Sequence, residues 1–417
     1  MLKVVETFSG IGAQAKALKN INVEHEILAT ADWDINAIIA YDLIHNGNYT
    51  FRKEPRQSRE DFLNKLKSKT LSLDGKKSIT EKQLNKLSIN VLERLCNAIE
   101  RSNNLISVTD IKGRELPEKF DLLTYSFPCQ DLSTAGFWHG NKGGIDRNAN
   151  NRSSMLWQIE RILLERFKGK LEMPKFLLME NVVNITAERN KENLNEWVKS
   201  LNRMGYTSYP MILNAKDFGL PQKRRRFYML SILTKNDKAL IKNIDKYFEN
   251  NDLQNEEYLE KLQIKMIKLN KILKTDYTIK EYLNEALESQ PNDTTSRRQI
   301  YDENLKIFKN NKIQIDILPT LTTKQDRNPN SGVIEFDSQI SNKSSFRYIT
   351  PREGFMLMGF SEKDYNNIIR NNFIGTKTNL FFTRDKLNKM AGNSIAVPVL
   401  EQIFKQVIEI KEKFLDI

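Results

Sequence analysis

The chain has 417 residues, with 65 Lys and Arg against 53 Asp and Glu, and a formal net charge of +12. Its 39% hydrophobic and 28% charged residues exclude wholesale disorder, and no apolar run approaches the ~18 residues of a membrane span. Two cysteines and three histidines leave little for a disulfide framework or a zinc site. We therefore expect a soluble, cytoplasmic protein of about two or three domains, without a signal peptide or a metal site.

Short apolar runs alternate with amphipathic helices over the first 230 residues, which is typical of a doubly wound sheet with parallel strands. Helices are predicted at 13–19 and at 153–167, and a further helix passes through residues 37–44. In the helix predicted at 153–167, an apolar stripe that we interpret as core is formed by Leu156, Ile159, Leu163 and Phe167. The predicted strands are 3–8, 25–32, 105–110, 121–127, 176–180, 207–213 and 226–232.

Two segments interrupt this alternation. Residues 51–104 form a long, charged and mostly helical insertion, for which a solvated scaffold is the simplest interpretation. Residues 235–345 are rich in Lys, Asn and Asp, and we interpret them as a second, smaller domain that is helical first and β-like from 313 to 336. After it, an amphipathic helix begins near Pro398 and carries Val397, Leu400, Phe404, Val407 and Ile408.

Three predicted strands end in residues that suit a nucleoside. The string FSGIG (8–12) forms a strand-to-helix turn, where glycines let backbone amides approach an anion at the helix N-terminus. After the second strand, Asp32 can accept ribose hydroxyls and Trp33 can cover an adenine face. The third strand ends in Asp110 and Ile111. Each residue alone is more simply a cap or a core side chain, but three successive strand ends favour a ligand site, because open α/β sheets bind ligands there.

The following strands end in reactive groups. Cys129 follows a proline at a strand end, in the string SFPCQ, and precedes the polar segment 131–150, which we interpret as a lid. Glu180 ends the fifth predicted strand. Strand alternation places Arg224 and Arg226 on one face. A core thiol and a solvated charge run are the ordinary explanations, but around one nucleoside site these groups predict a nucleophile, a proton handler and an anion clamp.

In this order, the motifs resemble those of the DNA (cytosine-5) methyltransferase family of the bacterial restriction–modification type. The resemblance extends over both sides of the variable segment, and Thr320-Leu321 resembles a pair late in the family's target-recognition domain. Glu6 stands where many members have Asp, and Ala13 where many have a second Gly. The matching strings are FSGIG, Asp32-Trp33, Asp110, SFPCQDLSTAG, Glu180-Asn181-Val182, QKRRR (222–226), TPREGFMLMGF (350–360) and AGNSIAVP (391–398).

The resemblance implies an α/β, Rossmann-like, S-adenosylmethionine-dependent methyltransferase fold, with a mixed sheet covered by helices on both faces and a smaller variable target-recognition domain. We therefore expect a catalytic and cofactor-binding domain at 1–234, with the insertion at about 51–104. The target-recognition domain would span 235–345. Residues 346–417 would return to the first domain, with the C-terminal helix completing it.

The resemblance also implies a mechanism. Cys129 would add to C6 of a cytosine flipped out of duplex DNA, because C5 is a poor nucleophile until a thiolate has added. Glu180 would bind the N3/N4 edge, Arg226 would bind O2, and Arg224 would favour the thiolate. S-adenosylmethionine would supply the methyl group, and loss of the C5 proton with expulsion of the thiolate would release 5-methylcytosine.

The remaining site residues follow from the same motifs, with base readout expected from polar side chains of the variable domain in the major groove. For each of these side chains taken singly, an ordinary surface position is the simpler explanation. The residues expected at the cofactor are Phe8, Gly10, Gly12, Asp32, Trp33, Asp110, Ile111, Pro128, Asn393 and Ser394. Those expected at DNA are Gln130, Ser133, Arg297, Arg298, Thr320, Leu321, Lys324, Gln325, Arg327 and Asn330.

Several alternatives stay open at this point. The positive charge fits a polyanion but also follows from a Lys- and Asn-rich mutational bias. A tRNA cytosine-5 methyltransferase would use the same chemistry, whereas a non-catalytic DNA-binding protein, a nicotinamide oxidoreductase and an adenine amino-methyltransferase each leave the Cys129 motif unexplained. We expect a monomer that acts on double-stranded DNA, with a cognate endonuclease by family habit and no stable complex with it. Some bacterial CpG-specific members have a similar insertion, but residues 322–331 differ from theirs, so no target site is inferred.

Overall fold

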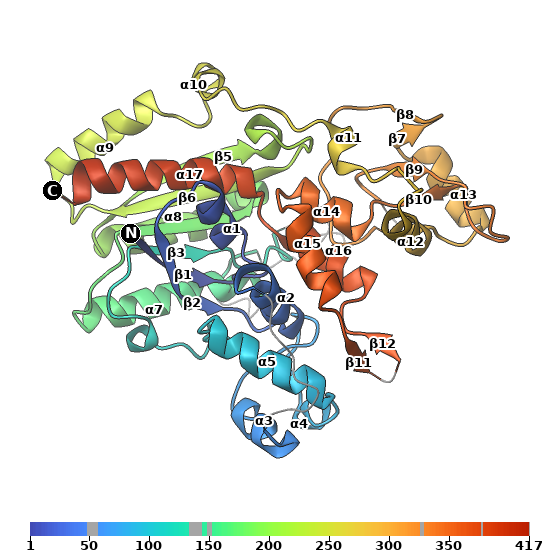
Figure 1. Cartoon of the computed structure of the whole chain (residues 1–417). Helices are drawn as coiled ribbons and strands as arrows, with labels where there is room; N and C mark the ends of the chain where they lie inside the picture. Colours follow the sequence, from blue (N-terminus) through green and yellow to red (C-terminus); the bar gives the residue numbers. More distant parts are fainter. Residues whose placement is uncertain (48–56, 133–143, 148–151, 326–328, 377, 417) are drawn as a thin grey trace.

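The computed structural model describes residues 1–47, 57–132, 144–147, 152–325, 329–376 and 378–416 (Figure 1). Its centre is a six-stranded sheet in the order β2-β1-β3-β4-β6-β5. The first four strands are parallel, and β6 is antiparallel to both of its neighbours. A parallel strand after β5 would need a crossover of about a dozen residues, and the connection is shorter. The strands are β1 (Leu2–Thr7), β2 (His25–Ala31), β3 (Leu122–Tyr125), β4 (Phe176–Val182), β5 (Tyr206–Asn214) and β6 (Arg225–Leu233).

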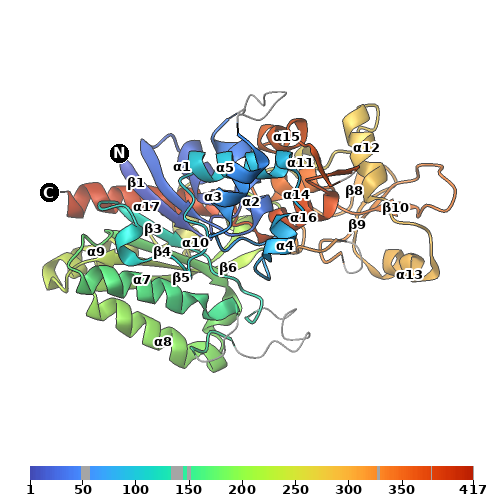
Figure 2. The ribbon, with the colours of Figure 1, turned by 90° about the horizontal axis from the view of Figure 1, so that it is seen from below.

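Helices cover both faces of this sheet, which confirms the predicted α/β class and its mixed sheet (Figure 2). Successive residues of β3 point to opposite faces, so Leu122 joins one hydrophobic cluster and Leu123 the other. The first cluster includes side chains from α1 (Ala13–Asn20), α2 (Ile35–His45) and α17 (Val397–Ile410). The second includes side chains from α7 (Leu156–Lys168) and α8 (Glu188–Arg203).

Two sequence predictions in this region are wrong. Residues 105–110 form no strand, because Ile106 has φ +69° and Asp110 closes a turn with the Ser107 carbonyl at 3.0 Å. The sheet therefore ends at β2, and the cysteine motif follows the third strand along the chain. In α7, Phe167 is 45% exposed while Arg166 is 1% exposed, because the Arg166 guanidinium donates to backbone carbonyls on three sides.

The insertion is helical, as predicted, but it is more than a solvated scaffold. It contains α3 (Arg59–Leu66), α4 (Glu81–Leu84) and α5 (Ile89–Arg101). Leu92 and Leu95 of α5 are fully buried and belong to the same hydrophobic cluster as α2. The apolar face of α5 is thus part of the main core, and only its polar face is solvated.

After β6 the chain builds helices and then a small sheet of order β10-β9-β7-β8, at the far end of the molecule from the two termini (Figure 1). The predicted order of helices before strands is confirmed. The helices are α9 (Lys238–Asn250), α10 (Glu256–Lys261), α11 (Leu269–Ile272), α12 (Lys280–Ser289) and α13 (Thr295–Glu303). The strands are β7 (Lys306–Lys309), β8 (Lys312–Ile313), β9 (Val333–Glu335) and β10 (Phe346–Arg347).

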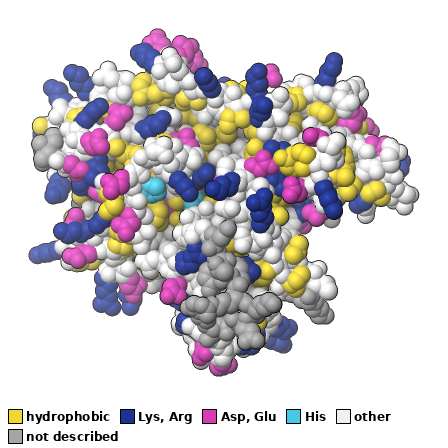
Figure 3. Space-filling view, in the orientation of Figure 1, with side chains coloured by type: hydrophobic (Ala, Val, Ile, Leu, Met, Phe, Trp, Pro, Cys, Tyr) yellow, Lys and Arg dark blue, Asp and Glu magenta, His cyan; other side chains and the backbone are white. Residues whose placement is uncertain are grey.

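The last segment returns to the central sheet. It contains α14 (Pro351–Leu357), α15 (Glu362–Arg370), β11 (Ile374–Thr376), β12 (Asn379–Leu380), α16 (Arg384–Asn393) and α17. Figure 1 shows α17 lying beside α1, so the two ends of the chain pack together. Within the described residues, none of the helices combines the length and the apolar character that a membrane crossing requires. Figure 3 shows Lys and Arg spread over one face among acidic side chains.

Candidate functional site

The turn after β1 contains two glycines, which are required for different structural reasons. Gly10 has φ +54°, and a Cβ placed on it would meet nothing within 4 Å, so its exposed face borders open space. Gly12 has φ +76°, and its Cβ would come within 2.3 Å of His45 Nε2 and 2.6 Å of Tyr41. Phe8 also lies at positive φ, +55°. Packing against α2 therefore requires the second glycine, and backbone conformation requires the first.

The ends of β1 and β2 are joined through a carboxylate. Asp32 accepts the Gly10 N–H at 2.9 Å with one oxygen and the Asp34 N–H at 2.9 Å with the other. Burial, together with the nearby Asp34 charge, raises the pKa of Asp32 to about 6. Trp33 is half-buried and packs its indole against the main core. These residues place a carboxylate next to an indole at the end of β2.

The two residues predicted for the third strand lie on a turn instead. Asp110 is exposed and accepts a hydrogen bond from the Thr109 hydroxyl at 2.8 Å, whereas Ile111 is 2% exposed and packs in the second hydrophobic cluster. The carbonyl of Thr109 and that of Val108 accept from Arg161 on α7. The turn therefore sits beside the sheet, held by α7, rather than at the end of a strand.

The cysteine segment after β3 is held from two directions. Asn181 Nδ2 donates to the Phe127 carbonyl at 3.0 Å, and Ser153 Oγ donates to the Pro128 carbonyl at 2.8 Å. Cys129 is a half-buried free thiol. Burial raises the pKa of Cys129, and the Arg226 charge opposes that shift more than any other neighbouring charge does. Asn181 of the Glu-Asn-Val motif thus positions the backbone before the proline, and Ser153 positions the backbone after it.

A carboxylate and a guanidinium lie on the neighbouring strands. Glu180 on β4 and Arg226 on β6 approach to 3.5 Å between Oε1 and Nε, and both side chains are mostly buried. Burial raises the pKa of Glu180, while the charges of Arg226 and Arg224 lower it. Since β3, β4 and β6 are adjacent, the structure brings Cys129, Glu180 and Arg226 to one sheet edge.

Arg224 is buried, whereas a side chain that clamps an anionic ligand would face solvent. It is 3% exposed, and its guanidinium donates to the carbonyls of Leu321 at 3.0 Å, Gly392 at 3.0 Å and Ser394 at 2.8 Å. Two of these acceptors belong to the predicted cofactor motif, and one to the predicted recognition pair. Arg224 therefore ties three chain segments together beside the cysteine.

Gln222 adds to this tie, and sequence reasoning assigned it no role. Its Nε2 donates to the Leu357 carbonyl at 2.9 Å, and its Oε1 accepts the Leu321 N–H at 2.8 Å. Thr320 donates its hydroxyl to the Lys223 carbonyl at 2.6 Å. The sequence signal that could have identified Gln222 was its place at the start of the QKRRR string. Thr320 and Leu321 thus anchor the variable segment to β6, and Asn393 lies exposed nearby at the end of α16.

The predicted DNA-contacting residues separate into two groups. Gln130, Lys324 and Asn330 are exposed. Gln325 is 4% exposed, and its amide is used within its own loop, by Thr322 and Ser331, so it faces no groove. Arg298 is paired with Asp293 at 2.6 Å, and Arg297 bonds to the Tyr348 hydroxyl, so neither is a free phosphate ligand here. Ser133, Arg327 and most of the predicted lid lie outside the described residues.

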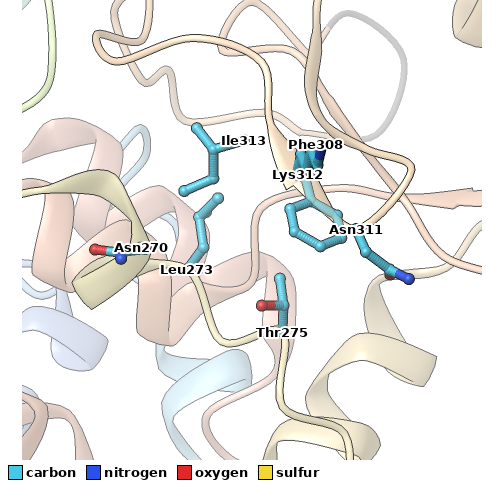
Figure 4. A pocket seen from close by; sticks show the side chains of 7 residues that line it. All are labelled: Asn270, Leu273, Thr275, Phe308, Asn311, Lys312 and Ile313. Carbon is cyan, nitrogen blue, oxygen red and sulfur yellow. The ribbon is translucent and has the colours of Figure 1, made fainter.

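A cavity of about 510 Å³ lies away from this edge, between α11 and the β7–β8 hairpin (Figure 4). Leu273, Phe308 and Ile313 provide its apolar lining, with Asn270, Asn311 and Lys312 at its rim. Among the described residues, no group of three or more His, Cys, Asp or Glu side chains has an arrangement that could hold a metal ion. The chemically equipped edge is therefore the one that carries Cys129.

Comparison with known proteins points to one family. A sequence model described as C-5 cytosine-specific DNA methylase matches residues 66–409. The chain is 33% identical to the orphan methyltransferase M.SssI of Spiroplasma monobiae over 97% of each chain. It is 30% identical to the type II methyltransferase M2.ScrFI of Lactococcus lactis subsp. cremoris, over 98% of this chain and 99% of the relative.

Solved structures agree at the level of the fold. The S. pombe Dnmt2 methyltransferase superposes with a TM-score of 0.58 at 15% identity, over 98% of this chain and 99% of that one. The Entamoeba histolytica methyltransferase EhMeth has a TM-score of 0.56 at 16% identity, over 98% of both chains. These identities support a shared methyltransferase fold alone.

Proposed function

Because this chain belongs to the C-5 cytosine-specific DNA methylase family, we propose that it methylates C5 of a cytosine flipped out of a short duplex DNA sequence. Its enzyme class is DNA (cytosine-5-)-methyltransferase, and the roles of individual residues are the proposal. The observation that carries it is the grouping of Cys129, Glu180 and Arg226 on three adjacent strand ends, with Glu180 and Arg226 3.5 Å apart. A thiol, a carboxyl group and a guanidinium match the C6 carbon, the N3/N4 edge and the O2 atom of cytosine.

Cys129 is the proposed nucleophile. Its thiolate forms a bond to C6, and the electron pair of the C5=C6 bond then makes C5 nucleophilic toward a methyl group. S-adenosylmethionine, when bound, would supply an electrophilic methyl group carried on its sulfonium centre. Removal of the C5 proton by a base restores the C5=C6 double bond and expels the thiolate. Because burial raises the pKa of Cys129, the nearby Arg226 charge is needed to favour the thiolate.

Glu180 is proposed to hold the N3/N4 edge of the base. Addition of sulfur at C6 is easier when N3 is protonated, and a carboxylic acid can donate that proton. The raised pKa of Glu180, caused by burial, favours the neutral form that such a donation requires. Arg226 would donate to O2, and its proximity to Glu180 keeps the two side chains aligned on one edge.

The residues around Gly10 fit the proposed cofactor. The open space beside Gly10 admits a ligand next to the backbone, and Asp32 holds both of its carboxylate oxygens at that edge. Asp32 would then accept ribose hydroxyls and Trp33 would cover the adenine. Asn393 lies at the exposed end of α16, where Arg224 holds the adjoining carbonyls. Phe8, Gly12, Asp110, Ile111, Pro128 and Ser394 complete the proposed contacts.

The target base must leave the duplex to reach Cys129, at a cost of about a few kcal/mol. The segment from Gln130 to Asn150, with Ser133, is the proposed cover for the flipped base. The residues that flank this segment are tied together, since Ser153 Oγ bonds to Pro128 and Arg152 donates to the Gln130 side chain.

Bisulfite sequencing of genomic DNA and total RNA tests the proposal, using a methylation-free bacterial host that expresses the chain. Protected cytosines in one short DNA context are expected, whereas protection confined to RNA would favour the tRNA alternative. A modification enzyme paired with an endonuclease is the proposed biological role, which the relative named a type II methyltransferase supports and the relative named an orphan methyltransferase does not.

A Cys129→Ser variant should lose methylation while keeping DNA binding. Cys96→Ser is the matched control, because Cys96 is a buried thiol on α5 in the insertion. Methylation by the Cys129→Ser protein at the wild-type rate would contradict the covalent mechanism.

A further inference from the structure

The insertion sends one loop back to the cofactor edge of the sheet. This rim loop comprises residues 72–78, between α3 and α4. The Ser72 N–H donates to the Trp33 carbonyl at 2.7 Å, and the Ile35 N–H donates to the Ser72 carbonyl at 3.0 Å. Asn36 Nδ2 adds a bond to the next carbonyl of the loop at 2.9 Å. The rim loop is therefore attached to the turn that directly follows β2.

The rim loop is rigid by its own hydrogen bonds. The Asp74 carboxylate accepts the N–H groups of Lys76 at 2.8 Å and Lys77 at 3.2 Å. Ser72 Oγ donates to the Lys77 carbonyl at 2.5 Å. These bonds fix the backbone of both lysines, while both side chains are exposed. Two positive charges are thus presented on a preformed turn.

A second attachment comes from α16. Lys389 Nζ lies 2.9 Å from Asp34 Oδ2 and also donates to the Asp74 carbonyl. Gly75 is buried against this pair at φ +64°, where a Cβ would stand 3.0 Å from Asp34 Oδ2 and 3.3 Å from Lys389 Nζ. Since Lys389 lies one helical turn before Asn393, the rim loop connects both halves of the proposed cofactor edge.

Arg152, which precedes α7, has charged neighbours on both the rim loop and the cysteine segment. Its guanidinium interacts electrostatically with the charges of Asp131, Asp74, Cys129 and Asp34. A DNA strand that delivers its base to Cys129 would bring its phosphates toward these neighbours of Arg152.

Within the described residues, neither of the two exposed lysines is ion-paired through its side chain. Across the described parts of the chain, no carboxylate lies within 4.0 Å of either the Lys76 or the Lys77 ammonium group, and neither makes a side-chain hydrogen bond there. Many other basic groups are paired, as Arg298 is with Asp293. Unpaired lysines on a fixed turn suit phosphates, which they bind with release of counterions.

We propose that Lys76 and Lys77 bind the phosphate backbone of the DNA strand that carries the target cytosine. This inference rests on the proposed function, and it gives the insertion a role in substrate binding. The contacts would position the strand without reading its sequence, so they would act on all duplexes alike.

The test is the salt dependence of DNA binding by a Lys76→Gln/Lys77→Gln double variant. A fluorescently labelled 30-bp duplex of random sequence is titrated with protein at several KCl concentrations from 50 to 200 mM, and anisotropy is recorded. Each phosphate contact contributes about 0.9 to the slope of log K against log salt, so the slope should fall by about 2. The matched control, Lys242→Gln/Lys246→Gln, removes two exposed charges from α9, at the opposite end of the sheet in Figure 1.

Cofactor binding by the same proteins, followed by calorimetry with S-adenosylmethionine, reports whether the cofactor edge is intact. A reduced slope with unchanged cofactor affinity supports the proposal. An unchanged slope overturns the proposal, whether or not cofactor affinity is lost. The proposed function fails separately, if the wild-type chain methylates no cytosine in DNA.

Discussion

Replacing Arg224 by methionine tests whether this side chain ties segments together or clamps an anion. The guanidinium makes three hydrogen bonds to backbone carbonyls, and the side chain is 3% exposed. A net loss of about 1 to 1.5 kcal/mol per bond predicts a decrease of about 3 to 4.5 kcal/mol in the free energy of unfolding. Methionine retains most of the aliphatic packing, so the loss reports mainly on the hydrogen bonds.

The assay is urea unfolding followed by circular dichroism, with Arg225→Met as the control. Arg225 is the neighbouring residue but is exposed, so its replacement should change stability by no more than about 0.5 kcal/mol. Affinity for S-adenosylmethionine should also fall in Arg224→Met, because two of the lost hydrogen bonds hold the carbonyls of Gly392 and Ser394, which flank Asn393. Equal stability of the two variants, with methyl transfer lost only in Arg224→Met, would refute the tie and restore the anion clamp.

Three further changes test other parts of the site. The single-turnover rate of methyl transfer should rise with pH through the neutral range, because burial raises the pKa of Cys129 and only the thiolate reacts; Arg226→Ala should move this rise to higher pH. Glu180→Gln should slow methyl transfer in single-turnover assays without lowering cofactor affinity, and a loss of cofactor affinity would remove Glu180 from the cytosine pocket. Glu353→Gln should lower the urea unfolding free energy by about 3 to 5 kcal/mol, because it leaves the fully buried Arg347 charge without its carboxylate; an unchanged midpoint would contradict that.

Much of the fold could be predicted from the alternation of apolar runs and amphipathic helices. The strand and helix positions of the first half follow from periods of two and 3.6 residues, which are local properties. The two wrong predictions have separate causes. Residues 105–110 are apolar enough for a strand, but the Asn104 side chain bonds to the Ile106 N–H at 2.7 Å and turns the chain instead. Phe167 continues the stripe of α7 beyond the point where the core ends, and is exposed.

The candidate site could be predicted in outline for the same reason. Cys129 follows a strand and Glu180 lies near the end of another, and these carboxyl ends must meet at one edge if the sheet is α/β. That argument did not predict that β6 is antiparallel. The start of an antiparallel strand lies at the same edge as the ends of the parallel strands beside it. This direction is why Arg226, near the start of β6, meets Glu180 near the end of β4.

The order of residues along the chain specifies which chemical groups are present and the enzyme family that this order resembles. How distant segments use these groups follows from the way the chain packs. In the sequence Arg224 is one charge in a basic string, whereas in the fold it donates hydrogen bonds to the carbonyls of residues 321, 392 and 394. The insertion read as a solvated scaffold until its rim loop was found on the cofactor edge. Sequence periodicity reports on neighbours within one element, whereas these contacts join residues separated by tens to hundreds of positions, and only packing can specify them.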